Sequence, residues 1–280
     1  MRVSQPSDRV VVKFWGVRGS VACPGPDTVV YGGNTSCVEL LCGAERLVLD
    51  AGTGLRLLGL ALASEDVVDL DLFLSHTHLD HIGGLPFFAP LFDAENDIRL
   101  WAGHLRPEHG LVDVIGSVMT APLFPVAIEG FASDTSYNDF ACGRVLNPKP
   151  GVHVHTARLN HPGRATGYRV EYGGRTICYV TDTEHTPGAP DATILALIAG
   201  ADLVIYDCTY TDDELPRYVG WGHSTWQEGV RLCESAGAGT LVIFHHDPSR
   251  DDRALDRLAE EAERVRPGTI VAREGLVLHY

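Results

Sequence analysis

The stretch Ser75-His76-Thr77-His78-Leu79-Asp80-His81 places three imidazoles and a carboxylate within six residues. It directly follows residues 70–74, whose apolar pattern predicts a buried strand. Imidazole nitrogens and carboxylate oxygens are the ligands that zinc and similar divalent metals prefer. A histidine-rich surface turn is the simpler alternative, but ligand-type residues at spacings of two, two and one favour a metal site.

The spacing within this stretch indicates two metals rather than one. His76 and His78 can face one metal together, whereas the neighbours Asp80 and His81 point differently and could bind a second. The pattern His-x-His-x-Asp-His resembles the signature of the metallo-β-lactamase fold superfamily. This resemblance implies an α/β fold, a four-layer αββα sandwich with the metal site at one edge of its two sheets. It also implies a later His, an Asp and a final His, each after a strand.

The rest of the chain supplies these residues in the implied order. His161 follows one predicted strand, Asp182 follows the predicted strand 175–180, and His245-His246 follows the predicted strand 241–244. Because side chains alternate along a strand, only one of His245 and His246 can face the site, and we predict His245. The resemblance therefore implies a division of ligands: His76, His78 and His161 for one metal, Asp80, His81 and His245 for the other, and Asp182 shared.

Composition limits the class of protein. The chain has 280 residues, 45% of them hydrophobic, which predicts one domain over residues 1–280 with a flexible leader over 1–9. The sequence contains neither a run of about 20 apolar residues nor a visible secretory signal, and its seven cysteines form no Cys-x-x-Cys pair. We therefore expect a cytoplasmic protein with reduced thiols and no membrane partner. The net charge of −15 disfavours long nucleic acid as a partner.

The expected cofactors are two divalent ions, zinc first, with manganese or iron as alternatives. They would hold a bridging hydroxide that attacks a phosphodiester. Asp80 is expected to act both as a metal ligand and as a catalytic group. We expect His223 to donate a proton to the leaving oxygen, since it stands at a predicted helix start outside the ligand set. Asp207 could orient His223. Arg18, in the turn-rich segment 16–34, is a candidate for binding a substrate phosphate.

A second resemblance narrows the chemistry. Asp207-Cys208-Thr209-Tyr210, Gly222-His223-Ser224-Thr225 and Ile243-Phe244-His245 follow the order of motifs in the ribonuclease Z-like phosphodiesterase branch of the superfamily. The tRNA-processing members of that branch carry a basic arm, and no such basic insertion is visible here. The resemblance therefore implies a small phosphodiester substrate, such as a cyclic nucleotide or a cyclic phosphate ester. We also consider a homodimer as the assembly that the protein forms.

Alternatives remain open at this point. The chain could be an RNA-processing nuclease, a thioester- or lactam-type metallo-hydrolase, or a non-catalytic ligand sensor. Asp50 fits either a residue that orients a ligand histidine or an ordinary turn. Residues 85–92 are predicted to form one short helix. The proline-rich residues 120–152 are predicted to be irregular and to form a lid or the lip of the substrate cleft.

Overall fold

Two seven-stranded sheets dominate the computed structural model, which describes residues 9–280. Residues 1–8 of the expected leader lie outside this described part. In spatial order, the first sheet contains β14 (Val277–His279), β1 (Val10–Gly16), β2 (Cys37–Cys42), β3 (Glu45–Leu49), β4 (Asp69–Leu74), β5 (Asp97–Ala102) and β6 (Asp134–Asp139). The second contains β13 (Ile270–Val271), β12 (Thr240–Phe244), β11 (Leu203–Asp207), β10 (Arg175–Val180), β9 (Ala165–Tyr172), β8 (His153–Leu159) and β7 (Val145–Leu146).

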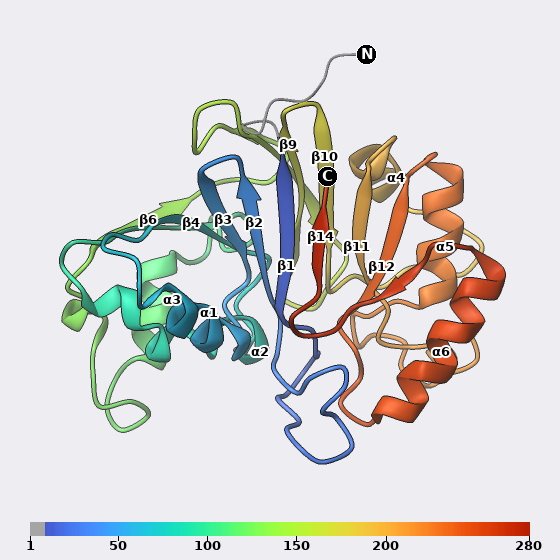
Figure 1. Ribbon diagram of the computed structural model, residues 1–280, viewed down its shortest axis with the longest axis horizontal. Helices are drawn as coiled ribbons and strands as arrows, with labels where there is room; N and C mark the ends of the chain where they lie inside the picture. Colours follow the sequence, from blue (N-terminus) through green and yellow to red (C-terminus); the bar gives the residue numbers. More distant parts are fainter. Residues whose placement is uncertain (1–8) are drawn as a thin grey trace.

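Helices cover the outer face of each sheet, as Figure 1 shows. On the first sheet these are α1 (Gly54–Leu62), α2 (Leu79–Ile82) and α3 (Leu111–Val118). On the second they are α4 (Ala192–Ile198), α5 (Trp226–Ser235) and α6 (Asp252–Val265). The α/β class and the four-layer αββα sandwich predicted from the sequence are therefore confirmed. None of the helices within residues 9–280 combines the length and the apolar character needed to cross a bilayer.

The inner faces of the two sheets share one hydrophobic core. Phe14 of β1 packs against Phe244 of β12 with ring centroids 6.0 Å apart, and Phe73 of β4 packs against Tyr168 of β9 at 5.5 Å. All four side chains are fully buried. Burial of such aromatic area is the main favourable contribution to folding, so the two sheets are held face to face mainly by this layer.

Two expectations about local structure were wrong. Residues 85–92 form two 3₁₀ helices, Leu85–Phe87 and Ala89–Phe92, instead of one helix. Pro90 lacks the amide hydrogen that the interior of a continuous helix would require. Residues 120–152 are not wholly irregular, because they contain the 3₁₀ helix Ile128–Gly130 and the strands β6 and β7. The strand β6 pairs in parallel with β5 and completes the edge of the first sheet.

The ends of several strands meet at one edge of the sandwich. The strands β10, β11 and β12 run parallel, and β8 shares their direction because it pairs antiparallel to β9, which pairs antiparallel to β10. Loops that leave the carboxyl ends of parallel strands converge at the same edge. The residues after β8, β10, β11 and β12 are therefore brought together, opposite the loop that follows β4.

Candidate metal centre

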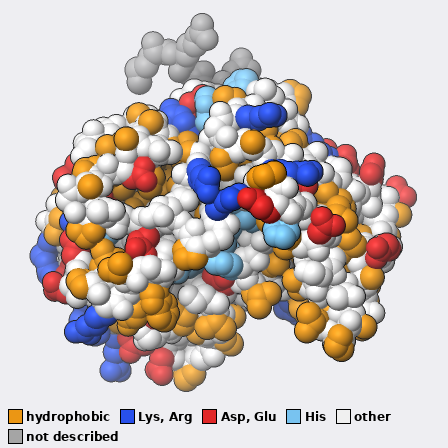
Figure 2. Space-filling view, turned by 180° about the vertical axis from the view of Figure 1, so that it is seen from behind, with side chains coloured by type: hydrophobic (Ala, Val, Ile, Leu, Met, Phe, Trp, Pro, Cys, Tyr) orange, Lys and Arg blue, Asp and Glu red, His pale blue; other side chains and the backbone are white. Residues whose placement is uncertain are grey.

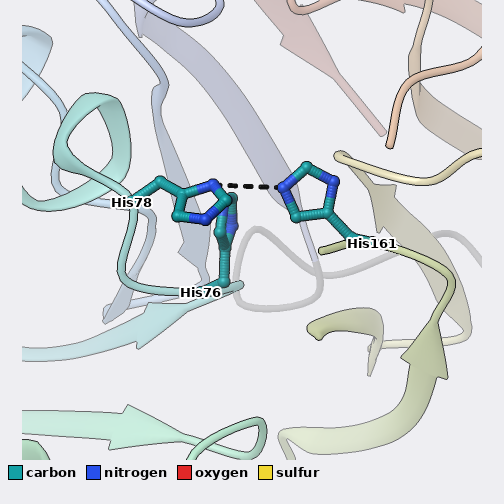
Figure 3. A group of neighbouring side chains, drawn as sticks. All are labelled: His76, His78 and His161. Carbon is teal, nitrogen blue, oxygen red and sulfur yellow. Dashed lines mark hydrogen bonds between the residues drawn. The ribbon is translucent and has the colours of Figure 1, made fainter. Parts of the chain in front are cut away.

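The first group of ligand-type residues joins the loop after β4 to the ends of β8 and β10. His78 Nδ1 lies 2.9 Å from His76 Nε2 and 3.1 Å from His161 Nε2. Figure 3 shows the three rings converging from two different segments. Asp182 Oδ1 lies 3.8 Å from His76 Nε2 and 3.7 Å from His161 Nε2. Three nitrogens and one oxygen thus point at a common centre.

The second group uses the other oxygen of the same carboxylate. Asp182 Oδ2 lies 3.2 Å from His81 Nε2 and 3.3 Å from His245 Nε2. Asp80 Oδ2 lies 3.2 Å from His81 Nε2 and 3.4 Å from His245 Nε2. The two imidazole nitrogens are 3.3 Å apart. Asp182 therefore offers one oxygen to each group, which is the arrangement of a bridging carboxylate.

These spacings fit divalent metals. Ligand bonds of about 2.0–2.1 Å in tetrahedral geometry place the ligand atoms about 3.3–3.4 Å apart. The ligand-atom distances within the second group, from 3.2 to 3.4 Å, agree with this spacing. Those within the first group extend from 2.9 to 3.8 Å, on either side of it. Histidine nitrogen with carboxylate oxygen is also the donor set that zinc and its neighbours bind. All seven predicted ligands are thus brought together in two groups, and their assignment as ligands stays a prediction.

The protonation of the cluster also favours a cation. Burial lowers the pKa of His76 well below its ordinary value, and the charge of His81 acts in the same direction, so the His76 ring is neutral and can donate a lone pair. Burial opposes a charged His81, but Asp182, Asp80 and Asp50 raise its pKa well above the ordinary value. Three carboxylates around one buried imidazole therefore attract a positive charge, which a metal ion can supply in place of a proton.

Asp50 fixes the orientation of His81. Its Oδ2 accepts hydrogen bonds from His81 Nδ1 at 2.8 Å, from the Ser75 hydroxyl at 2.7 Å and from the Tyr179 hydroxyl at 2.8 Å. Its Oδ1 accepts from the Ser75 amide at 2.6 Å. With the proton on Nδ1, His81 Nε2 presents a lone pair to the second group. Of the two interpretations left open for Asp50, the hydrogen bonds support the orienting role.

A backbone carbonyl and a threonine orient two other histidines. His161 Nδ1 donates to Gly222 O at 2.8 Å. His245 Nδ1 lies 3.0 Å from Thr209 Oγ1, which in turn lies 2.8 Å from Asp207 Oδ1. If the threonine hydroxyl donates to the carboxylate, it accepts from His245, and the Nε2 atom of His245 is left free for a metal. Asp207 is therefore connected to the second group through Thr209.

His223 stands beside the cluster without completing either group. Its Nδ1 lies 3.0 Å from Asp207 Oδ2, as the sequence predicted for an orienting pair, and its ring is stacked 4.9 Å from that of His245. Burial opposes its charge, but Asp207, Asp182 and Asp80 raise the pKa of His223 to about 9. Its Nε2 makes no hydrogen bond to any residue in the described part of the chain. The arrangement suits an imidazolium that can release a proton.

Three residues of the cluster and its support have left-handed backbones. Asp50, Asp182 and His245 have φ values of 62°, 56° and 60°. This conformation costs a residue with a Cβ roughly 1–2 kcal/mol. Each of these residues lies just beyond the end of a strand, where the change in backbone direction turns its side chain toward the cluster. Local strain is thus concentrated where the side chains must be aimed.

Two glycines allow the backbone to approach the ligands closely. A Cβ on Gly19 would lie 2.3 Å from Cε1 and 2.4 Å from Nδ1 of His245. A Cβ on Gly222, which has a φ of +86°, would lie 2.3 Å from Nδ1 of His161. The turn-rich segment 16–34 therefore packs directly against a ligand ring, and the amide of Ser20 donates to Asp80 Oδ2 at 2.7 Å.

Two other sequence candidates lie away from the cluster. His246 Nε2 donates to Ala272 O at 2.8 Å, and burial lowers its pKa to about 3, so the geometry favours His245 over His246 as the last ligand. The Arg18 side chain is fully buried, and it donates to Gly32 O at 2.8 Å and to Arg250 O at 2.7 Å. It thus fastens two loops together, and its predicted contact with substrate has no support in this arrangement.

Sequence reasoning did not find Thr209, Tyr179 or Gly222 as supporting residues. Tyr179 lies in β10 and its hydroxyl reaches Asp50 across the sandwich. Nothing in the local sequence marks such a contact, because the partner is more than one hundred residues away in the chain. Only Thr209, two residues after Asp207, could have drawn attention to this layer of support.

Comparison with known proteins agrees with the fold. Residues 45–246 match the family model described as a beta-lactamase superfamily domain. Ribonuclease Z of Haloarcula marismortui is 25% identical over 284 residues, covering 86% of this chain and 89% of that protein. The metallo-beta-lactamase fold protein YhfI of Bacillus subtilis has a TM-score of 0.74 at 20% identity, covering 98% of this chain and 100% of that one.

A diphosphatase from the PhnP family has a TM-score of 0.70 at 19% identity, covering 97% of each chain. At these identities the solved structures show the fold alone. The family model, however, spans more than half of the chain. All seven predicted metal ligands lie within its limits, with His245 one residue before its end. The chain therefore belongs to the beta-lactamase superfamily, and its activity, stated coarsely, is that of a metal-dependent hydrolase.

Proposed function

We propose that the protein is a phosphodiesterase that acts on small phosphodiesters, with residues 1–280 forming a single catalytic domain. The observation that carries this proposal is the Asp207–His223 pair beside the metal cluster. Hydrolysis of a phosphodiester releases an alkoxide that must gain a proton. The thiolate released from a thioester needs little protonation, so the pair favours phosphodiester over thioester chemistry.

The residues divide the work between holding metals and moving a proton. When bound, two divalent cations supply an activated water and neutralise charge that develops on the phosphoryl oxygens. The seven ligand residues would hold the cations, and Asp182 offers one carboxylate oxygen to each group. His223, charged at neutral pH, donates a proton from Nε2 to the leaving oxygen. Asp207 holds the ring by its Nδ1 atom.

The charge of the chain supports a small substrate. Its net charge is −15, and only Lys13 and Lys149 are lysines. Affinity for a long nucleic acid comes largely from many phosphate contacts with basic side chains, which an acidic surface opposes. A cyclic nucleotide, a cyclic phosphate ester or a short dinucleotide needs few such contacts outside the metal centre.

A nuclease of the ribonuclease Z type is the second candidate. It is favoured by the similarity to ribonuclease Z of Haloarcula marismortui, which extends over most of both chains. The same cluster and the same proton donor would serve an RNA phosphodiester. The two candidates differ only in the size of the substrate that the surface around the cluster accepts.

One screen separates these functions. The metal-loaded protein would be assayed with bis(p-nitrophenyl) phosphate, cyclic nucleotides, dinucleotides and precursor tRNA, and with nitrocefin and an acyl-thioester. We expect turnover of the small phosphodiesters and little or no cleavage of precursor tRNA at physiological salt. Nitrocefin and the acyl-thioester should not be hydrolysed. The variants His78→Ala and Asp182→Ala should lose metal and activity together. Efficient trimming of precursor tRNA would favour the nuclease, and turnover of nitrocefin or thioester alone would refute the proposal.

A further inference from the structure

A cavity of about 760 Å³ lies next to the metal centre and has an unusual lining. Four arginines line it, and none of its lining residues is an aspartate or a glutamate. The arginines are Arg106, Arg158, Arg164 and Arg169. In a chain with a net charge of −15, this is a local concentration of positive charge. Figure 2 shows basic side chains beside the histidines that reach the surface near the middle of that face.

Two lining residues connect the cavity to the metal centre. His104 Nε2 lies 3.1 Å from the hydroxyl of Thr77, which stands between His76 and His78, and the His104 ring is 6.4 Å from that of His76. Arg164 belongs to the short turn after His161, and its amide donates to the His161 carbonyl at 2.8 Å. The cavity and the metal centre therefore lie side by side, joined through His104 and Arg164.

Part of the charge in the cavity is not neutralised by the protein. Arg164 pairs with Glu108 at 2.8 Å, Arg106 with Asp139 at 3.4 Å and Arg169 with Glu171 at 2.7 Å. Arg158, which is exposed, forms no ion pair with any residue between 9 and 280. His104 is 5% exposed, and its Nδ1 has no hydrogen-bond partner. If the Thr77 hydroxyl donates to Nε2 of His104, then Nδ1 is a buried N–H donor without a partner.

We propose that this arginine-lined cavity binds a second phosphate group of the substrate, at the same time as the metal centre holds the phosphodiester. The guanidinium fork is the side chain best suited to a phosphate, and a cavity of this size holds a nucleotide-sized fragment. The assignment of the anion to the substrate rests on the proposed phosphodiesterase function. The substrate class is then a phosphodiester that carries a further phosphate.

The test compares two esters that differ by one phosphate: the p-nitrophenyl ester of thymidine 5′-phosphate, with and without a 3′-phosphate. Arg158→Glu should raise KM for the 3′-phosphorylated ester by about tenfold or more, since a charge-assisted hydrogen bond is lost, and leave KM for the other ester unchanged. Arg158→Gln should do the same more weakly. The matched control is Arg257→Glu on the exposed side of α6, which makes the same change in net charge away from the cavity and should alter neither KM.

The outcomes separate this inference from the proposed function. Equal changes in KM for the two esters, or none for the phosphorylated one, would overturn the cavity assignment and leave the phosphodiesterase intact. If wild-type protein hydrolysed neither ester, the proposed function would fail, and calorimetry with thymidine 3′,5′-bisphosphate would then decide about the cavity. Weaker binding to Arg158→Glu than to Arg257→Glu would support an anion site there, and equal binding would refute it.

Discussion

The carboxylate of Asp50 lies 2.8 Å from Nδ1 of His81, and both side chains are fully inaccessible to solvent. This contact sets which nitrogen of His81 carries the proton, and therefore which nitrogen can bind a metal. An amide in place of the carboxylate would keep the shape but remove the negative charge that His81 and the metal experience.

Asp50→Asn should therefore weaken metal binding by about 10–100-fold, which is the usual cost of losing a partner of a ligand histidine. The measurement is competition with a chromogenic chelator. The Asp50→Asn variant should keep the wild-type fold, as judged by circular dichroism. Unchanged affinity would mean that Asp50 serves only the packing of Ser75 and Tyr179.

Gly19→Ala should displace the ring of His245, because the new methyl group would lie 2.3 Å from Cε1 of that ring. We expect loss of about one of the two metals per chain, measured by elemental analysis of the purified protein. The control is Gly25→Ala in the same loop, where the new Cβ would lie 3.9 Å from the hydroxyl of Thr28 and should change nothing. Full metal content in both variants would show that the loop shifts to accommodate the methyl group without displacing His245.

Thr209→Val tests the connection between Asp207 and His245. The change removes the hydroxyl that lies 3.0 Å from His245 Nδ1 and leaves a buried donor without a partner. Affinity for the second metal should fall, as a chelator titration would show. Thr183→Val is a close control, since the Thr183 hydroxyl is buried and has no hydrogen-bond partner, so its loss should cost little. Similar affinities in the two variants would contradict the proposed connection.

His223→Ala should keep both metals but lose ~10²–10⁴ in turnover, the usual contribution of general acid–base catalysis. The loss should be largest for an alkoxide leaving group and small for p-nitrophenolate, which needs little protonation. The measurement is kcat on a pair of diesters that differ only in the leaving group. An equal loss on both would assign His223 to substrate binding, and loss of a metal would place it among the ligands.

The pH dependence of the reaction should report the Asp207–His223 pair. His223 acts in its charged form, and its pKa is raised to about 9, so kcat should fall as the pH rises through this value. Asp207→Asn removes the largest of the charges that raise this pKa. The alkaline limb should therefore move to lower pH by about one unit or more. An unmoved limb in a pH–rate profile would show that another group controls it.

The positions of the metal cluster could be predicted from the sequence because its residues follow strand ends in a fixed order, from His76 to His245. The supporting contacts could not, because they join segments that are far apart in the chain, as Tyr179 and Asp50 do. The strand β6 was missed since its sequence, Asp-Thr-Ser-Tyr-Asn-Asp, is polar and lies at the edge of a sheet. Its pairing comes from the neighbouring β5 rather than from its own composition.

The ligands of each group come from both sheets of the sandwich. His76 and His78 follow β4 in the first sheet, whereas His161 follows β8 in the second, and the second group joins His81 to His245 in the same way. A bound cation is thus a cross-link between the halves of the molecule at an edge where the hydrophobic layer ends. At a thousandfold excess over its Kd, such a ligand adds about 4 kcal/mol to the free energy of unfolding. A chelator would then do more than stop the reaction, because it would also remove this contribution to the free energy of unfolding.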